Sequence, residues 1–95
     1  MFFPGDYIQP LYEVDCVTTF SRQRPNALFI PLPLTVYPSQ IFKVYDCQYS
    51  KSHKSWHLTF TIVGDDSLGF IESQGNHFKK ITDPDTLANL KVLYE

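Results

Sequence analysis

The sequence predicts a small, mainly β domain that ends in a short helix. Apolar and polar side chains alternate in WHLTFTI at 56–62, aromatic and β-branched residues are dense in QIFKVYDCQY at 40–49, and a proline-led amphipathic segment follows at 83–94. A period of two is typical of a half-buried strand, and a spacing of three to four indicates a helix. At 95 residues we expect a single domain, 1–95, with one modest core.

The segment WHLTFTIVGDDSLGFIES predicts a hairpin. Its first strand places four apolar side chains on one face: Trp56, Leu58, Phe60 and Ile62. Gly-Asp-Asp-Ser then supplies turn residues, so we expect the hairpin tip at 63–68. Asp65 and Asp66 are therefore interpreted as turn residues facing water, because carboxylates that act together in catalysis must point into one pocket.

The segment at 40–49 predicts a second strand with an irregularity. Phe42 and Val44 share one face, but the apolar residues beyond them have the opposite phase. Such a change of phase indicates a β-bulge near Tyr45 and Asp46, or a strand covered on both faces. The polar SKSHKS at 50–55 is expected to be a surface loop.

The N-terminal half predicts a strand at 12–20, an exposed loop at 21–26 and an extended or edge segment at 27–39. In the first, apolar Tyr12, Val14 and Cys16 alternate with acidic residues. The last contains three prolines, which lack the N–H that a central strand donates.

The C-terminal part predicts a short strand in HFKKI, 77–81, and then a helix over 83–94. Asp83 suits the N-cap and Pro84 the first helical position. Helical spacing relates Leu87, Leu90 and Tyr94. Pairing of LKVLY as an edge strand is the alternative.

The order of several pieces resembles a known type of protein. Gly5-Asp6-Tyr7-Ile8, Ile41-Phe42-Lys43-Val44-Tyr45, the Gly-Asp-Asp turn and His77-Phe78-Lys79-Lys80-Ile81 follow one another along the chain. This is similar to small bacteriophage and bacterial proteins reading roughly "GDYV … YKV … DDG … F.KI", which form Src-homology-3-like barrels related in shape to KOW domains. The resemblance spans 4–81 and implies a five- to six-stranded antiparallel barrel without catalytic apparatus. The proline-rich insertion and the terminal helix depart from that pattern.

Charge and cysteine content favour a cytoplasmic protein. The net charge of −2 gives no global field that would attract a polyanion. Cys16 and Cys47 lie in predicted strands and are expected to be buried reduced thiols, with a disulfide as the alternative. The first residues have no basic leader, and no apolar run is long enough to span a membrane.

Catalytic and metal-binding motifs are lacking in the sequence. His53, His57 and His77 with the cysteines offer zinc-ligand types, but there is no Cys-x-x-Cys. Neither cysteine follows a glycine-rich elbow, and no Gly-x-Ser-x-Gly or phosphate-binding loop occurs. We therefore expect no enzyme activity, no metal and no cofactor.

Protein binding is the function that the sequence favours. A small phage-encoded or mobile-element-encoded protein that inhibits a host factor or immune system by stoichiometric binding fits the size and the resemblance. The predicted contact residues are Arg22, Arg24, Phe29, Tyr37, Tyr49, Lys54 and His57. The apolar segment from Leu28 to Tyr37, together with Phe2 and Phe3, offers a patch for self-association or for a partner.

Two alternatives stay open. Aromatic and basic residues interleave at Tyr49, Lys51, His53, Lys54, Trp56 and His57, with Lys43, Lys79 and Lys80 as extensions. That pattern is typical of nucleic-acid-binding barrels. The second alternative is a sponge for a phosphorylated small molecule or nucleotide, held by Arg22, Arg24 and Lys43, because guanidinium groups suit bidentate anion contacts.

Overall fold

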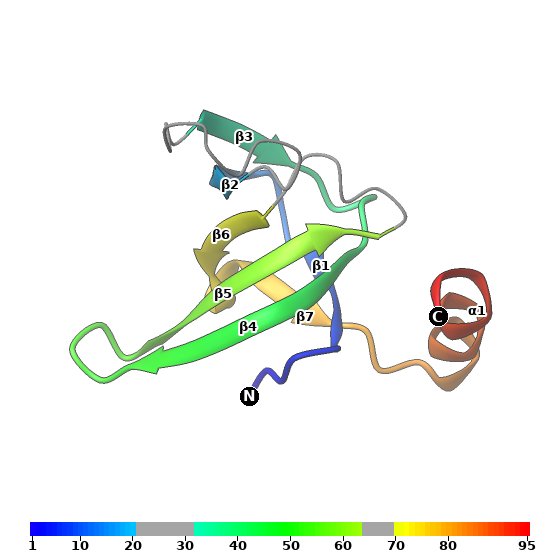
Figure 1. The fold of residues 1–95 in the computed structure, drawn as a ribbon. Helices are drawn as coiled ribbons and strands as arrows, with labels where there is room; N and C mark the ends of the chain where they lie inside the picture. The colour runs from blue at the N-terminus through cyan, green and yellow to red at the C-terminus, as the bar shows by residue number, and fades with distance from the viewer. Residues whose placement is uncertain (21–31, 64–69) are drawn as a thin grey trace.

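The computed structural model of the chain describes residues 1–20, 32–63 and 70–95 (Figure 1). Mainly β structure with one C-terminal helix confirms the coarse prediction. In chain order the elements are β1 (Tyr7–Pro10), β2 (Val14–Phe20), β3 (Leu32–Val36), β4 (Phe42–Ser50), β5 (Ser55–Ile62), β6 (Phe70–Gln74), the 3₁₀-helix η1 (Gly75–His77), β7 (Phe78–Lys80) and α1 (Pro84–Tyr94).

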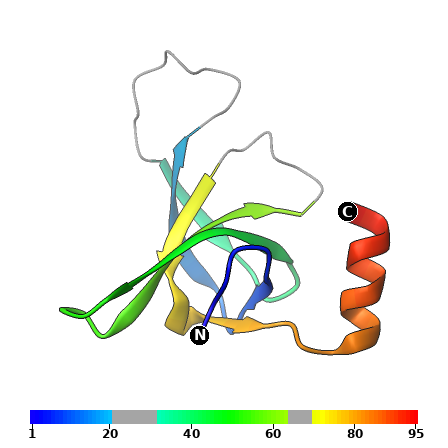
Figure 2. The same cartoon turned by 60° about the horizontal axis from the view of Figure 1, so that its bottom comes forward.

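The strands form one antiparallel sheet in the order β3-β2-β6-β5-β4-β1-β7. Figure 2 shows that the sheet is strongly curled, in the manner of a half-barrel, with α1 standing at one side. The expected five or six strands were wrong, because seven are present among the described residues. The 27–39 segment, expected to be extended or at an edge, contributes β3 at the edge of the sheet, a position that tolerates Pro33. The strand added to those predicted is β1, which pairs with β4 and β7.

The concave side of the sheet holds the core. Its main cluster consists of Ile8, Val14, Cys16, Val36, Phe42, Val44, Leu58, Phe60, Ile71 and Phe78. Phe60 is central, since its ring lies 5.0 Å from the rings of both Phe42 and Phe78 in edge-to-face contact. The predicted inward face of β5 is thus confirmed for Leu58 and Phe60, while Trp56 and Ile62 are half-buried at its two ends.

The predicted bulge in β4 is confirmed. The register between β4 and β5 shifts between Val44 and Asp46, so Tyr45 is the extra residue. The hairpin tip predicted at 63–68 lies almost wholly outside the described residues, as does the 21–26 loop. Cys16 is buried and Cys47 half-buried, and both are free thiols.

The helix α1 is formed as its sequence predicts. The Asp83 carboxylate accepts hydrogen bonds from the Thr86 N–H at 2.9 Å and from the Thr86 hydroxyl at 2.7 Å. Leu90 is its one buried residue, packing with Tyr7 and Ile81, and Leu87 is half-buried. Within the described residues, no helix has the length and hydropathy to cross a bilayer.

Candidate functional site: the β4–β5 arm

Strands β4 and β5 extend beyond the core as a two-stranded arm, residues 46–59. Their pairing continues without interruption from Asp46 opposite Thr59 to Ser50 opposite Ser55. In both Figure 1 and Figure 2 this hairpin projects from the body of the protein. Because one end is continuous with the central sheet, the arm presents side chains to solvent on a backbone that is already ordered.

The tip of the arm is a tight turn that ends in Lys54. Lys54 adopts a φ of 51°, in the left-handed region that non-glycine residues seldom occupy. The Ser50 hydroxyl accepts a hydrogen bond from the His53 N–H at 3.4 Å and lies 3.1 Å from the Ser52 hydroxyl. Lys51 and Lys54 are both exposed there, so the tip carries two positive charges.

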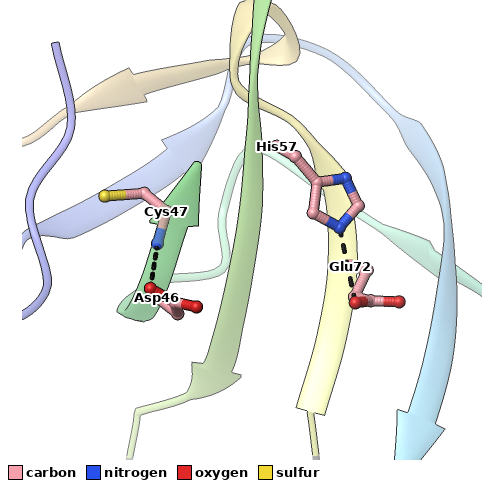
Figure 3. A network of polar contacts seen from close by, with 4 residues as sticks. All are labelled: Asp46, Cys47, His57 and Glu72. Carbon is pink, nitrogen blue, oxygen red and sulfur yellow. Dashed lines mark hydrogen bonds and ion pairs between the residues drawn. The ribbon is translucent and has the colours of Figure 1, made fainter. Parts of the chain in front are cut away.

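One face of the arm is polar. Gln48 opposes His57, and the His57 Nε2 lies 3.4 Å from Glu72 Oε1 on the neighbouring strand β6. Figure 3 shows His57 and Glu72 turned toward each other, with Asp46 accepting a hydrogen bond from the Cys47 N–H. Both partners of the His57–Glu72 contact are substantially exposed, so it contributes little stability.

The other face of the arm is aromatic. Cross-strand partners share a face in an antiparallel pair, so Cys47 and Leu58 lie on one side together with Tyr49 and Trp56. The Tyr49 and Trp56 rings are 5.5 Å apart, and Tyr49 is 52% exposed. The aromatic face therefore continues the line of core side chains out into solvent.

The N-terminal segment packs against the base of this aromatic face. The Cys47 thiol donates a hydrogen bond to the Phe2 carbonyl at 3.0 Å. A Cβ atom on Gly75 would lie 2.8 Å from Phe2 Cε2 and 3.0 Å from Trp56 Cβ. Glycine at position 75 therefore lets Phe2 approach Trp56 closely.

Neither thiol is prepared for nucleophilic chemistry. Burial raises the pKa of Cys47, with Asp46 and Asp6 acting in the same direction and Lys80 opposing them. Burial also raises the pKa of Cys16. Since the thiolate is the nucleophile, both groups stay protonated near neutral pH.

The structure brings together three of the seven predicted contact residues. Tyr49, Lys54 and His57 belong to the arm, although His57 lies on the polar face and Tyr49 on the aromatic face. Tyr37 is exposed but precedes the opposite end of β4, where its N–H donates to the Gln40 side chain at 2.9 Å. Arg22, Arg24 and Phe29 lie outside the described residues.

The segment predicted for self-association is only partly described. Of 28–37, Leu34 is half-buried against the core, Val36 is buried and Tyr37 is exposed. Sequence reasoning placed Phe2 in the same patch as this segment and missed its contact with Gly75 and Trp56. No local pattern could have revealed that contact, because it joins three distant parts of the chain.

The histidines do not gather. His53 is at the tip, His57 is on the polar face, and His77, in η1, has its Nδ1 2.5 Å from the Tyr12 hydroxyl. The described part of the chain contains no cluster of three or more His, Cys, Asp or Glu side chains arranged to hold a metal ion.

The lysines proposed to extend a nucleic-acid patch are divided. Lys43 pairs with Glu95 at 2.6 Å, and Lys80 pairs with Asp6 at 3.0 Å. Lys79 is exposed on β7. Lys80 also lies over the rings of Phe2 and Phe3, in the segment that packs against the base of the arm.

A hollow lies between α1 and the sheet. It has a volume of about 240 Å³ and is lined by Ser39, Gln40, Ile41, Ile62, Val63, Leu90 and Tyr94. Nearby, Tyr7 is buried and its hydroxyl makes no hydrogen bond of ordinary geometry to a described residue, although Lys43 and Glu95 lie near enough to influence it. Burial raises the pKa of Tyr7.

Comparison with protein-family models, with curated proteins and with solved structures finds no match.

Proposed function

We propose that this protein is a small non-catalytic binding protein that acts by stoichiometric protein–protein interaction, with the β4–β5 arm as its contact surface. One observation carries the proposal: Tyr49, 52% exposed, packs beside Trp56 on a projecting hairpin that is continuous with the central sheet. Exposed aromatic side chains on an ordered backbone supply large contact area at low entropic cost, and interfaces are enriched in them.

The biological setting is part of the same proposal. A phage or mobile-element origin, a host cytoplasm as the place of action and inhibition of a host factor or immune system are supported by the small size and by the resemblance in the Gly5–Ile8 and His77–Ile81 pieces. The Src-homology-3-like barrel belongs to the proposal too, supported by a strongly curled antiparallel sheet.

Affinity purification from cells of the native source tests the proposal. Tagged wild-type protein should retain one protein in about a one-to-one ratio by native mass spectrometry. Tyr49→Ser should lose that partner, because the exposed ring is removed, while Tyr37→Ser should keep it, because Tyr37 lies at the other end of β4. Equal retention by both variants contradicts the assignment to the arm.

Nucleic-acid binding is the second candidate, favoured by the exposed Tyr49 close to Lys51 and Lys54. It predicts that single-stranded oligonucleotides bind and that their affinity falls steeply with added salt, through counterion release. Tight, salt-sensitive oligonucleotide binding without any protein partner would replace the first proposal. The phosphate-sponge alternative has less support, because Lys43 is engaged by Glu95 and the two arginines lie outside the described residues.

A further inference from the structure

The aromatic face of the arm is one end of a longer strip that the N-terminal segment completes. Its members follow one another in a row, beginning at Lys80, whose Nζ lies 5.3 Å from the Phe3 ring centre and 6.0 Å from that of Phe2. Phe2 and Trp56 both lie against Gly75, within 2.8 and 3.0 Å of the position that a Cβ would take there, and the Trp56 ring lies 5.5 Å from that of Tyr49. We call Phe3, Phe2, Trp56 and Tyr49 the aromatic strip. Its outer members, Phe3 and Tyr49, are 53% and 52% exposed.

Charge is unevenly distributed along the aromatic strip. At the Tyr49 end, Lys51 and Lys54 are exposed, and neither belongs to a salt bridge found among the described residues. At the Phe3 end, Lys80 is neutralised by Asp6 at 3.0 Å. Two acidic residues, Asp46 on the arm and Glu72 on the neighbouring strand β6, lie in line with the polar face. The strip therefore changes from neutral and apolar at its base to cationic at its tip.

We propose that the aromatic strip docks an extended protein segment that carries apolar side chains at one end and carboxylates at the other, with the carboxylates at the Lys51–Lys54 tip. The inference rests on the proposed protein-binding function and adds the chemistry and the direction of the partner. Apolar side chains would cover Phe3 and the edge of Trp56, and carboxylates would meet the free lysines. Complementary charge at one end fixes the register of such a contact.

A nucleic acid fits this charge pattern less well. Its phosphates repeat along the whole strand, so a binding groove needs positive charge along its whole length. Here the base of the strip offers a lysine already paired with Asp6, and the chain as a whole carries a net charge of −2. Positive charge confined to one end suits a short cluster of carboxylates in a protein.

Selection of a displayed random-peptide library on the intact protein tests the proposal. We expect enriched peptides to combine apolar residues with Asp or Glu clustered at one end. Their binding should change the emission of Trp56, the single tryptophan of the chain.

The double variant Lys51→Glu/Lys54→Glu should weaken the affinity for these peptides by about tenfold, and selection on this variant should enrich basic peptides instead. Lys91→Glu on the exposed side of α1 is the matched control and should leave affinity unchanged. If the double variant misfolds, Lys51→Glu alone tests the same point and should show a smaller loss of peptide affinity.

A photo-crosslinking amino acid separates the two faces of the arm. Placed at Tyr49 it should crosslink to the enriched peptides; placed at Gln48, the adjacent exposed position on the polar face, it should not. The inference is overturned if the wild type enriches basic peptides or no peptides at all. It is also overturned if the peptides crosslink from Gln48 alone, or if the protein prefers single-stranded oligonucleotides. If a stoichiometric protein partner crosslinks through Gln48, the proposed function stands and this inference fails. If no protein partner is found, the proposed function fails with it.

Discussion

Lys43 Nζ lies 2.6 Å from Glu95 Oε1 and thereby joins strand β4 to the end of helix α1. The helix buries only Leu90, and a hollow remains between it and the sheet. Val92, on its outer side, is 82% exposed. Among the described residues, the attachment of α1 therefore depends on the apolar packing of Leu90 and the half-buried Leu87 and on one ion pair at its end.

Glu95→Gln should loosen the last turn of α1 without unfolding the sheet. The charge partner of Lys43 is removed, while Leu90 keeps its contacts with Tyr7 and Ile81. Hydrogen exchange should become faster in the amides of the last turn and stay unchanged in β5. High salt should raise the exchange rates of the wild type toward those of the variant, since salt screens a partly exposed ion pair. Lys79→Met on β7 is the control, and equal exchange in wild type and Glu95→Gln would contradict the role of the pair.

Acid should release the helix before it unfolds the sheet. Hydrogen bonds from the Thr86 hydroxyl and N–H lower the pKa of Asp83, and the Lys43 hydrogen bond lowers that of Glu95. A depressed folded-state pKa means that the contribution is present above the unfolded value of about 4 and is lost as pH falls through the folded-state value. Helical circular dichroism should therefore decline below about pH 4, ahead of the loss of Trp56 tertiary signal.

The Asp83 side chain itself is tested at neutral pH. Asp83→Ala removes the acceptor of the Thr86 N–H and should reduce helix content, whereas Asp83→Asn keeps a capping oxygen and should retain most of it. Equal helix content in both variants would show that the cap is dispensable.

Local patterns were sufficient to predict most elements. The phase change in β4 identified the bulge at Tyr45, because side-chain alternation responds directly to one inserted residue. Asp83 and Pro84 identified the helix start for a similarly local reason. The number of strands was missed because β1 has only four residues and is defined by its long-range pairing with β4 and β7. The prolines argued only against a central strand, and β3 lies at the edge of the sheet.

The candidate site was predicted less completely than the fold. Period-two alternation correctly placed Trp56 on the core face. It did not predict that the core ends before Trp56 and leaves this side chain half-buried. The contacts of Phe2 with Gly75 and of Lys80 with Phe3 join the N-terminal segment to residues far away along the chain. Only the tertiary fold creates such contacts, so sequence spacing gave no signal for the aromatic strip.

Truncation of a central core residue should cost far more than truncation of an apolar residue on α1. Leu58 is fully buried, whereas Leu93 is 70% exposed. Leu58→Ala should lower the free energy of unfolding by about 3 kcal/mol, and Leu93→Ala should change it by less than about 0.5 kcal/mol. Denaturant titration measures both, and similar losses would place Leu93 in an unrecognised packed contact.

Gly5 is required by its backbone conformation. Its φ is 94°, and its N–H donates to the Val44 carbonyl at 2.8 Å, which anchors the N-terminal segment beside the β4 bulge. No atom of the described residues lies within 4 Å of the position that a Cβ would take on Gly5, so backbone strain decides the outcome. Gly5→Ala should lower the free energy of unfolding by about 1 kcal/mol. Gly5→Asn should lower it by less, because asparagine tolerates a positive φ better than alanine. Chemical denaturation showing no difference between alanine and glycine would contradict this account.

Gly75→Ala tests the junction of the aromatic strip. The new methyl group would meet Phe2 Cε2 at 2.8 Å and Trp56 Cβ at 3.0 Å. Since Trp56 Cβ is fixed on β5, the Phe2 ring must move away. We expect a red-shifted Trp56 emission and a lower free energy of unfolding. Phe2→Ala should produce a similar red shift, because it also uncovers Trp56.

A double-mutant cycle decides whether Phe2 is the cause. In the Phe2→Ala background, Gly75→Ala should cost less free energy of unfolding than in wild type, because the ring that it displaces is already absent. The expected coupling lies within about 0.5 to 3 kcal/mol, the range for residues in contact. Additive effects would mean that the cost arises at the Trp56 backbone, and that Phe2 and Trp56 do not act as one surface.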